Sequence, residues 1–145
     1  MKHFEVTESQ GERTAWIYPE LTGDYEPVHG EPEPGTLAVK LKHITPRGAE
    51  ALQAKMISMG IMRKKVLRGG VIDVEVVKGR QADRDRLYAE AYVSDWQGFI
   101  KEGQPLAYSP DEMAALLANE IWLNKAIGKA TEEMESFLSR NGHAS

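Results

Sequence analysis

The sequence predicts a small α+β protein: a small antiparallel or mixed sheet with packed helices, followed by a helical C-terminal segment with a long terminal helix. Three local patterns carry this prediction. Residues 36–44 alternate apolar and basic side chains, as a half-buried strand does, and residues 71–77 alternate apolar and acidic ones. The run Tyr108-Ser109-Pro110-Asp111-Glu112 is a helix start, because the serine can cap exposed backbone N–H groups and the proline lacks an N–H.

Length and composition fit one domain, or a small domain with a helical appendage. The chain has 145 residues, a net charge of −4 and no cysteine. We divide it into an α+β part, residues 1–92, and a turn with a helical part, residues 93–145; a single domain overall is the alternative. The missing cysteines exclude disulfides and thiolate chemistry.

Charge and hydropathy also bear on partners and location. The acidic balance makes nucleic acid an improbable main partner. No apolar run approaches the ~20 residues that cross a bilayer, and the first residues carry acids rather than a signal peptide. We therefore expect a soluble cytoplasmic protein without a membrane partner.

In the N-terminal part, residues 14–18 form the first predicted strand, which Pro19 ends. A proline-rich loop over residues 19–35 is expected to be extended or mobile. A helix then begins at Thr45-Pro46 and ends at Gly60 in a left-handed conformation.

A basic segment precedes the second alternating strand and contains Arg63, Lys64, Lys65 and Arg68. Two interpretations compete: a patch for nucleic acid or phosphate, and a solvated turn. We favour the turn, because no aromatic residue interleaves the basic ones as single-strand binding would require. After the strand, residues 81–92 favour a helix.

The turn region contains Asp95, Trp96, Gly98 and Gly103. We expect a hairpin-like turn in which Gly103 adopts a positive φ. Asp95 is expected to brace the turn while Trp96 is buried beneath it; a ligand-binding role for this pair is the alternative.

From Pro110 the helical pattern runs to about residue 138, with Asn119 either capping a second segment or marking a bend. An apolar face on this helix is the predicted partner-binding surface. Its candidate residues are Met113, Leu117, Trp122, Ile127, Met134 and Phe137. The alternative is a wide face that is buried because the helix packs from two sides.

Chemistry-bearing patterns are scarce. The four histidines show no metal-binding spacing, so we expect no catalytic residue, metal or cofactor. Asp73 and Glu75 form the only close acidic pair on a predicted strand. With a loop histidine such as His29 they define one alternative, a small metal-dependent hydrolase.

Two stretches, residues 94–99 and 102–111, together with the helix carrying Leu116-Leu117, resemble the C-terminal half of tail assembly chaperones of long-tailed, siphovirus-like bacteriophages. The likeness runs from about residue 93 to 137. It implies a non-enzymatic protein of the host bacterial cytoplasm that binds the tape-measure or tail-tube protein and prevents premature polymerisation. The alternative is a structural tail or head–tail connector component retained in the virion. Homo-oligomerisation is compatible with both.

Overall fold

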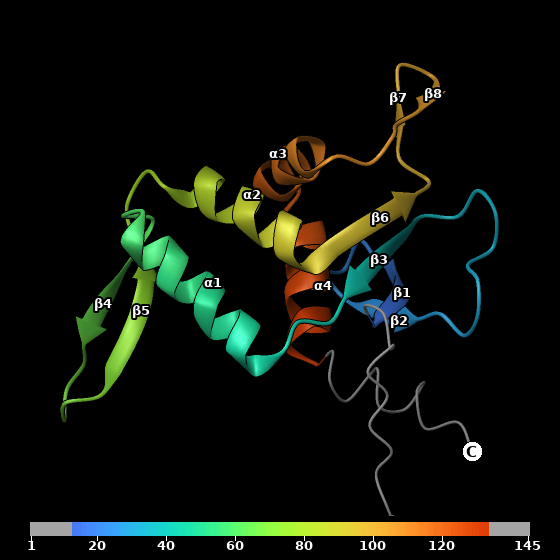
Figure 1. Ribbon diagram of the computed structural model, residues 1–145. Helices are drawn as coiled ribbons and strands as arrows, with labels where there is room; N and C mark the ends of the chain where they lie inside the picture. Colours follow the sequence, from blue (N-terminus) through green and yellow to red (C-terminus); the bar gives the residue numbers. More distant parts are fainter. Residues whose placement is uncertain (1–12, 134–145) are drawn as a thin grey trace, which may run out of the picture.

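A computed structural model describes residues 13–133 of the chain and places four antiparallel strands in a central sheet (Figure 1). In spatial order these strands are β2 (Tyr25–Pro27), β1 (Thr14–Pro19), β3 (Ala38–Lys42) and β6 (Val93–Gln97). Their sequences are rich in β-branched and aromatic residues, which suit a pleated surface. The α+β class predicted from the sequence is confirmed.

The sheet buries two cross-strand rows of apolar side chains on one face. One row joins Ala15, Leu41 and Val93, and the other joins Ile17, Val39 and Trp96. Three helices supply the opposing half of this core: α2 (Gln81–Tyr92), α3 (Pro110–Asn119) and α4 (Ile121–Glu132). The predicted strand over residues 36–44 is therefore right, and its Val39 and Leu41 do face the core.

Strand β6 ties the two halves of the chain together. It follows α2 directly and pairs with β3, so a strand from the second half of the chain joins a sheet whose other strands come from the first half. Helices α3 and α4 then contribute to the same core as β1 and β3. The boundary at residue 92 thus falls inside one sheet and one core.

Two strands stand outside the central sheet as a separate ribbon. Helix α1 (Pro46–Ser58) leads to β4 (Met62–Val66), which pairs antiparallel with β5 (Ile72–Val76). We call this pair the β4–β5 ribbon; Figure 1 shows it at the end of the molecule away from β2. Three residues of the basic segment predicted to be a solvated turn, Arg63, Lys64 and Lys65, lie instead on strand β4 and pair with β5. Arg68 does lie in a turn, between the two strands, and all four basic residues are exposed.

Helix α1 begins and ends as its sequence predicts. The Thr45 side chain accepts a hydrogen bond from the Gly48 N–H at 3.0 Å, and Pro46 occupies the first turn. Gly60 follows the helix with a φ of 74°, the left-handed conformation that glycine adopts readily.

The proline-rich connection over residues 19–35 is more ordered than predicted. It contains β2, and Val28 is buried. The Tyr18 hydroxyl accepts a hydrogen bond from the Glu33 N–H at 3.1 Å, and the Gln97 side chain donates to the Glu33 carbonyl at 2.7 Å. Pro27 is compatible with β2 because β2 is an edge strand: one row of its N–H groups has no partner strand, so the missing N–H of a proline breaks no hydrogen bond there.

The long terminal helix predicted from residue 110 is broken in two. Glu120, with φ −115° and ψ 94°, leaves helical geometry between α3 and α4. Asn119 does not cap α4; its side-chain amide donates to the Ala115 carbonyl within its own helix. Residues 134–145 lie outside the described part, and within that part no helix has the length and apolar character needed to cross a membrane.

Candidate functional site

The predicted partner-binding face lies largely inside the molecule. Met113 and Ile127 are fully buried and Leu117 is 4% exposed, because α3 and α4 turn these side chains toward the sheet. The expectation of an exposed apolar face is therefore corrected for these three. Trp122 is half-buried against the same core and donates its indole N–H to Glu120 at 2.9 Å. Met134 and Phe137, also named for this face, fall outside the described residues.

The residues of the predicted turn motif pack around one indole ring. Trp96 is 5% exposed and donates its indole N–H to the Leu106 carbonyl at 2.8 Å. The centre of the Phe99 ring lies 4.4 Å from the centre of the indole, and the Tyr108 ring meets the indole edge-on with a centre-to-centre distance of 5.3 Å. The indole is thus satisfied internally, which supports the structural interpretation of this motif over ligand binding.

Between these rings a short hairpin of β7 (Ile100–Lys101) and β8 (Gln104–Pro105) brings the chain back to α3. Glu102 and Gly103 both have positive φ, 53° and 77°, as a tight two-residue hairpin turn requires. The Ser109 hydroxyl then accepts from the Glu112 N–H at 3.1 Å, with Pro110 in the first turn. The predicted turn and helix start are both confirmed.

Three residues of the motif, Tyr108, Asp95 and Gly98, lie within the sheet or contact it or the segment that leads into β3. The Tyr108 hydroxyl donates to the Val93 carbonyl at 2.9 Å, and burial raises the pKa of this phenol to about 12. Asp95 accepts a hydrogen bond from the Trp96 N–H at 2.8 Å within strand β6. Gly98 lies so close to residues 36 and 37 that a Cβ there would be 2.6 Å from the Leu37 Cα.

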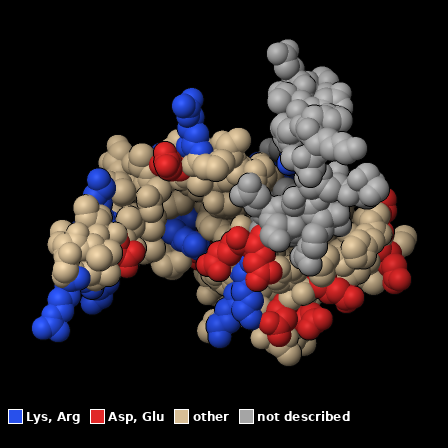
Figure 2. Space-filling model, turned by 90° about the horizontal axis from the view of Figure 1, so that it is seen from below, with Lys and Arg blue, Asp and Glu red and all other residues tan. Residues whose placement is uncertain are grey.

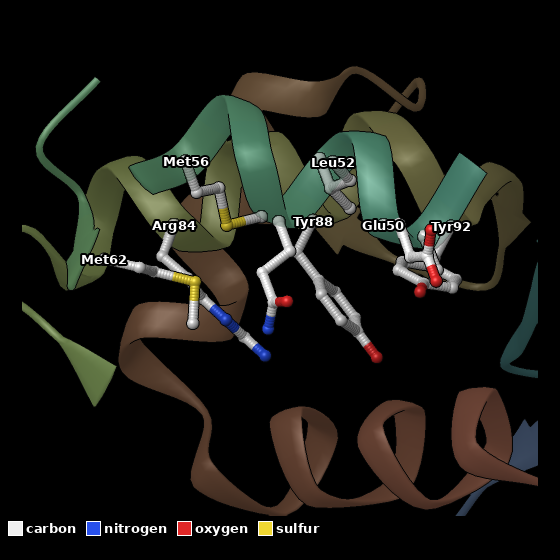
Figure 3. Close-up of a pocket in the computed structure, with 9 residues that line it drawn as sticks. Glu50, Leu52, Met56, Met62, Arg84, Tyr88 and Tyr92 are labelled. Atoms are coloured by element: carbon white, nitrogen blue, oxygen red, sulfur yellow. The ribbon is translucent and has the colours of Figure 1, made fainter. Parts of the chain in front are cut away.

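A groove lies between α1, α2 and the start of β4 (Figure 3). Its volume is about 340 Å³. It is lined by Ala49, Glu50, Leu52, Gln53 and Met56 of α1, Met62 of β4, and Arg84, Tyr88 and Tyr92 of α2. Met56 is the only buried residue of α1, so most of this helix's apolar stripe borders the groove rather than a core.

Aromatic rings form the α2 side of the groove. The centres of the Tyr88 and Tyr92 rings lie 4.5 Å apart, and burial raises the pKa of both phenols. The Tyr88 hydroxyl shares a hydrogen bond with that of Thr131, so α4 supports the ring from behind. This hydrogen bond holds the Tyr88 ring in the wall of the groove.

One cation also lines the groove. The guanidinium of Arg84 lies 4.2 Å from the centre of the Tyr88 ring and 3.1 Å from the carboxylate of Asp85. Asp85 is fully buried, and its second oxygen has no hydrogen-bond partner within residues 13–133. Sequence reasoning missed this buried carboxylate, because a charged residue within a polar helix reads as solvated; Gln81, four residues earlier and bonded to it at 3.0 Å, is the only local signal.

The residues proposed for a metal-dependent hydrolase are not assembled. Asp73 and Glu75 lie on β5, and His29 follows β2 at the other end of the molecule in Figure 1. The Arg63 side chain, 2.6 Å from Glu75, lowers the pKa of that carboxylate and occupies it in an ion pair. Within the described part, no group of three or more histidines and acids could hold a metal ion.

The chain matches no protein-family model, no curated protein and no solved structure.

Proposed function

We propose that this protein is a non-enzymatic assembly chaperone of a bacteriophage tail, which holds a helix of its client in the groove between α1 and α2. The groove is the observation that supports the proposal most directly. It combines two methionines, two tyrosines in ring contact and a leucine with one cation, Arg84, and one carboxylate, Glu50. Such a lining suits a surface that binds and releases protein helices.

The geometry of the lining favours a helical client. Ala49, Leu52 and Met56 recur at spacings of three and four along α1, and Arg84, Tyr88 and Tyr92 recur every four residues along α2. Two such rows form a trough into which the apolar face of a third helix can pack. Methionine side chains adapt to differently shaped partners, which a chaperone of a long, variable helix requires.

The client class follows from the resemblance of residues 93–137 to tail assembly chaperones. Tape-measure proteins are the expected helical clients, and the tail-tube subunit is the alternative. An acidic residue in the client helix would meet Arg84, whose position Asp85 and Tyr88 already restrict. The client is thereby expected to present apolar residues at helical spacing together with one carboxylate.

Co-expression with the neighbouring tape-measure and tail-tube proteins, followed by pull-down and light scattering, tests this proposal. We expect a soluble complex that Leu52→Glu abolishes, because the new charge would lie in the groove. Ile121→Glu is the matched control: Ile121 is 71% exposed on α4 and outside the groove, so the complex should persist. Ile127→Asp is unsuitable, because a charge at this buried site would unfold the protein.

Two results would overturn the proposal. Binding to neither tail protein would remove the chaperone role. Recovery of the protein from purified virions by mass spectrometry would instead favour a structural tail or connector component. A Leu52→Glu variant that still binds would keep the chaperone role but move the client off the groove.

A further inference from the structure

The two ends of the molecule carry opposite charge. Residues 61–78, which contain the β4–β5 ribbon, hold five basic and two acidic side chains, a net charge of +3. Residues 20–35, here called the acidic segment, hold five acidic side chains and no lysine or arginine. Figure 1 places the ribbon at one end of the molecule and the loop after β2 at the other. In Figure 2, blue atoms mark the ribbon end and red atoms gather toward the opposite end.

The ribbon also leaves apolar side chains uncovered. Val66 and Ile72 are directly paired across the two strands and are 71% and 63% exposed, and the neighbouring Val71 is 59% exposed. Both strands are edge strands, since no other strand of the described chain pairs with them. Isolated two-stranded ribbons are marginally stable in water, so a covering surface would stabilise this one.

The charges that remain unpaired lie beside these apolar residues. Arg63 and Lys65 are engaged with Glu75, at 2.6 and 3.6 Å, whereas no ion pair within residues 13–133 involves Lys64 or Arg68. In the acidic segment, Asp24 pairs with Lys129 at 2.8 Å. The remaining acids of this segment, Glu20, Glu26, Glu31 and Glu33, are all exposed.

We infer that copies of this chain associate head to tail, with the β4–β5 ribbon of one copy docked on the acidic segment of the next. The ribbon brings a net charge of +3 against the four carboxylates of the acidic segment that remain after Asp24 pairs with Lys129, and Leu21, 79% exposed, offers an apolar contact within this segment. Ribbon-to-ribbon pairing would set +3 against +3 and is disfavoured. Because each copy then uses two different surfaces, the contact builds a ring or a filament rather than a closed dimer.

Sedimentation velocity of the full chain alone, over a concentration series at low and high salt, measures this association. We expect species larger than a dimer at low salt and dissociation toward monomer at high salt, because exposed charges are screened. The client proteins are absent from this experiment. Its outcome is therefore independent of whether the groove binds a tail protein.

Charge reversal identifies the two surfaces. A ribbon variant (Lys64→Glu, Arg68→Glu, Lys78→Glu) and an acidic-segment variant (Glu20→Lys, Glu31→Lys, Glu33→Lys) should each be monomeric at low salt. All six side chains are exposed, so the thermal midpoint of each variant should stay near that of the natural chain. Combining all six changes in one chain restores opposite signs, and we expect association to return.

The inference is overturned if the natural chain stays monomeric at every concentration at low salt, or if it stops at a dimer. Association that survives ribbon reversal would also overturn it, as would a six-fold variant that remains monomeric. A monomeric natural chain whose ribbon variant loses a tail protein would instead assign the ribbon to that client.

Discussion

At the scale of single residues, the turn after β6 requires a glycine at position 98, where there is no room for a side chain. Gly98 has a φ of 86°, and a Cβ there would lie 2.6 Å from the Leu37 Cα and 2.7 Å from the Thr36 carbonyl oxygen. These are backbone atoms, which cannot rotate away as a flexible side chain would. Gly103, with a φ of 77°, has nothing within 4 Å of such a Cβ. A substitution at Gly103 would therefore introduce backbone strain alone, whereas one at Gly98 would introduce both backbone strain and a steric clash.

We predict that Gly98→Ala lowers the free energy of unfolding by about 2–4 kcal/mol, the sum of left-handed strain and displaced backbone. Gly103→Ala, the matched control, should lower it by only about 1 kcal/mol. Urea unfolding monitored by tryptophan fluorescence measures both. Equal losses in the two variants would show that the approach of residues 36–37 contributes nothing to stability.

Tyr108 links stability to alkaline pH. Its hydroxyl donates to the Val93 carbonyl, and burial raises its pKa from the ordinary 10.0 to about 12. Between these two values the unfolded chain has lost the proton while the folded chain retains it. The contribution to stability is therefore complete below pH 10 and is lost as pH rises through 12.

We predict that the free energy of unfolding falls as pH rises from about 10 to about 12 and that Tyr108→Phe makes this fall shallower. Tyr88 and Tyr92, whose pKa values burial also raises, act in the same direction and contribute to the remaining slope. Chemical unfolding at stepped pH measures the slopes. An unchanged slope in the variant would mean that Tyr108 titrates alike in both states.

At the scale of elements, α1 and the β4–β5 ribbon are attached less firmly than the sheet. Only Met56 of α1 is buried, and Ile61, fully buried, is the main apolar anchor between that helix and the ribbon. By contrast, β1 and β3 share the core with three helices. Local opening of the ribbon therefore exposes far less apolar surface than opening of the sheet.

We predict that backbone amides of residues 62–76 exchange with deuterium through local opening, while those of β3 exchange only on global unfolding. Native-state hydrogen exchange at increasing denaturant separates the two mechanisms, since only the second depends strongly on denaturant. The measurement should be made at high salt, where neighbouring copies do not cover the ribbon. Similar protection of both regions would place the ribbon within the global folding unit.

The elements also show why sequence reasoning succeeded locally. Thr45 and Ser109 each accept the backbone N–H three residues later, as their cap positions predicted. The strand at residues 71–77 was predicted as correctly as the one at residues 36–44. Yet Val39 is fully buried whereas Ile72 is 63% exposed, although both belong to alternating strands. Alternation defines a strand's apolar face but not what that face meets.

At the scale of the whole molecule, the sheet is assembled from both ends of the chain. Strand β6 supplies an outer position of the sheet, and α3 and α4 supply Met113, Leu123 and Ile127 to the core. In a chain that stops at residue 92, the core-facing apolar side chains of β1 and β3 would lose the cover that α3 and α4 provide.

We predict that a fragment of residues 1–92 does not fold alone and that adding a separate fragment of residues 93–145 restores structure. Near-ultraviolet circular dichroism and thermal melts of each fragment and of the mixture measure this. A cooperative melt of the first fragment by itself would contradict the shared core and re-establish a domain boundary at residue 92.

The sequence by itself determined the α+β class, the helix starts at Thr45 and Ser109, and the tight turn at Gly103, because caps, prolines and positive φ act within a few residues. Tertiary structure alone decided that Met113, Leu117 and Ile127 form core and that the groove lies between α1 and α2. An apolar helix face is the same in sequence whether a sheet or a client covers it. Burial depends on contacts between distant segments, and those follow from the assembled fold.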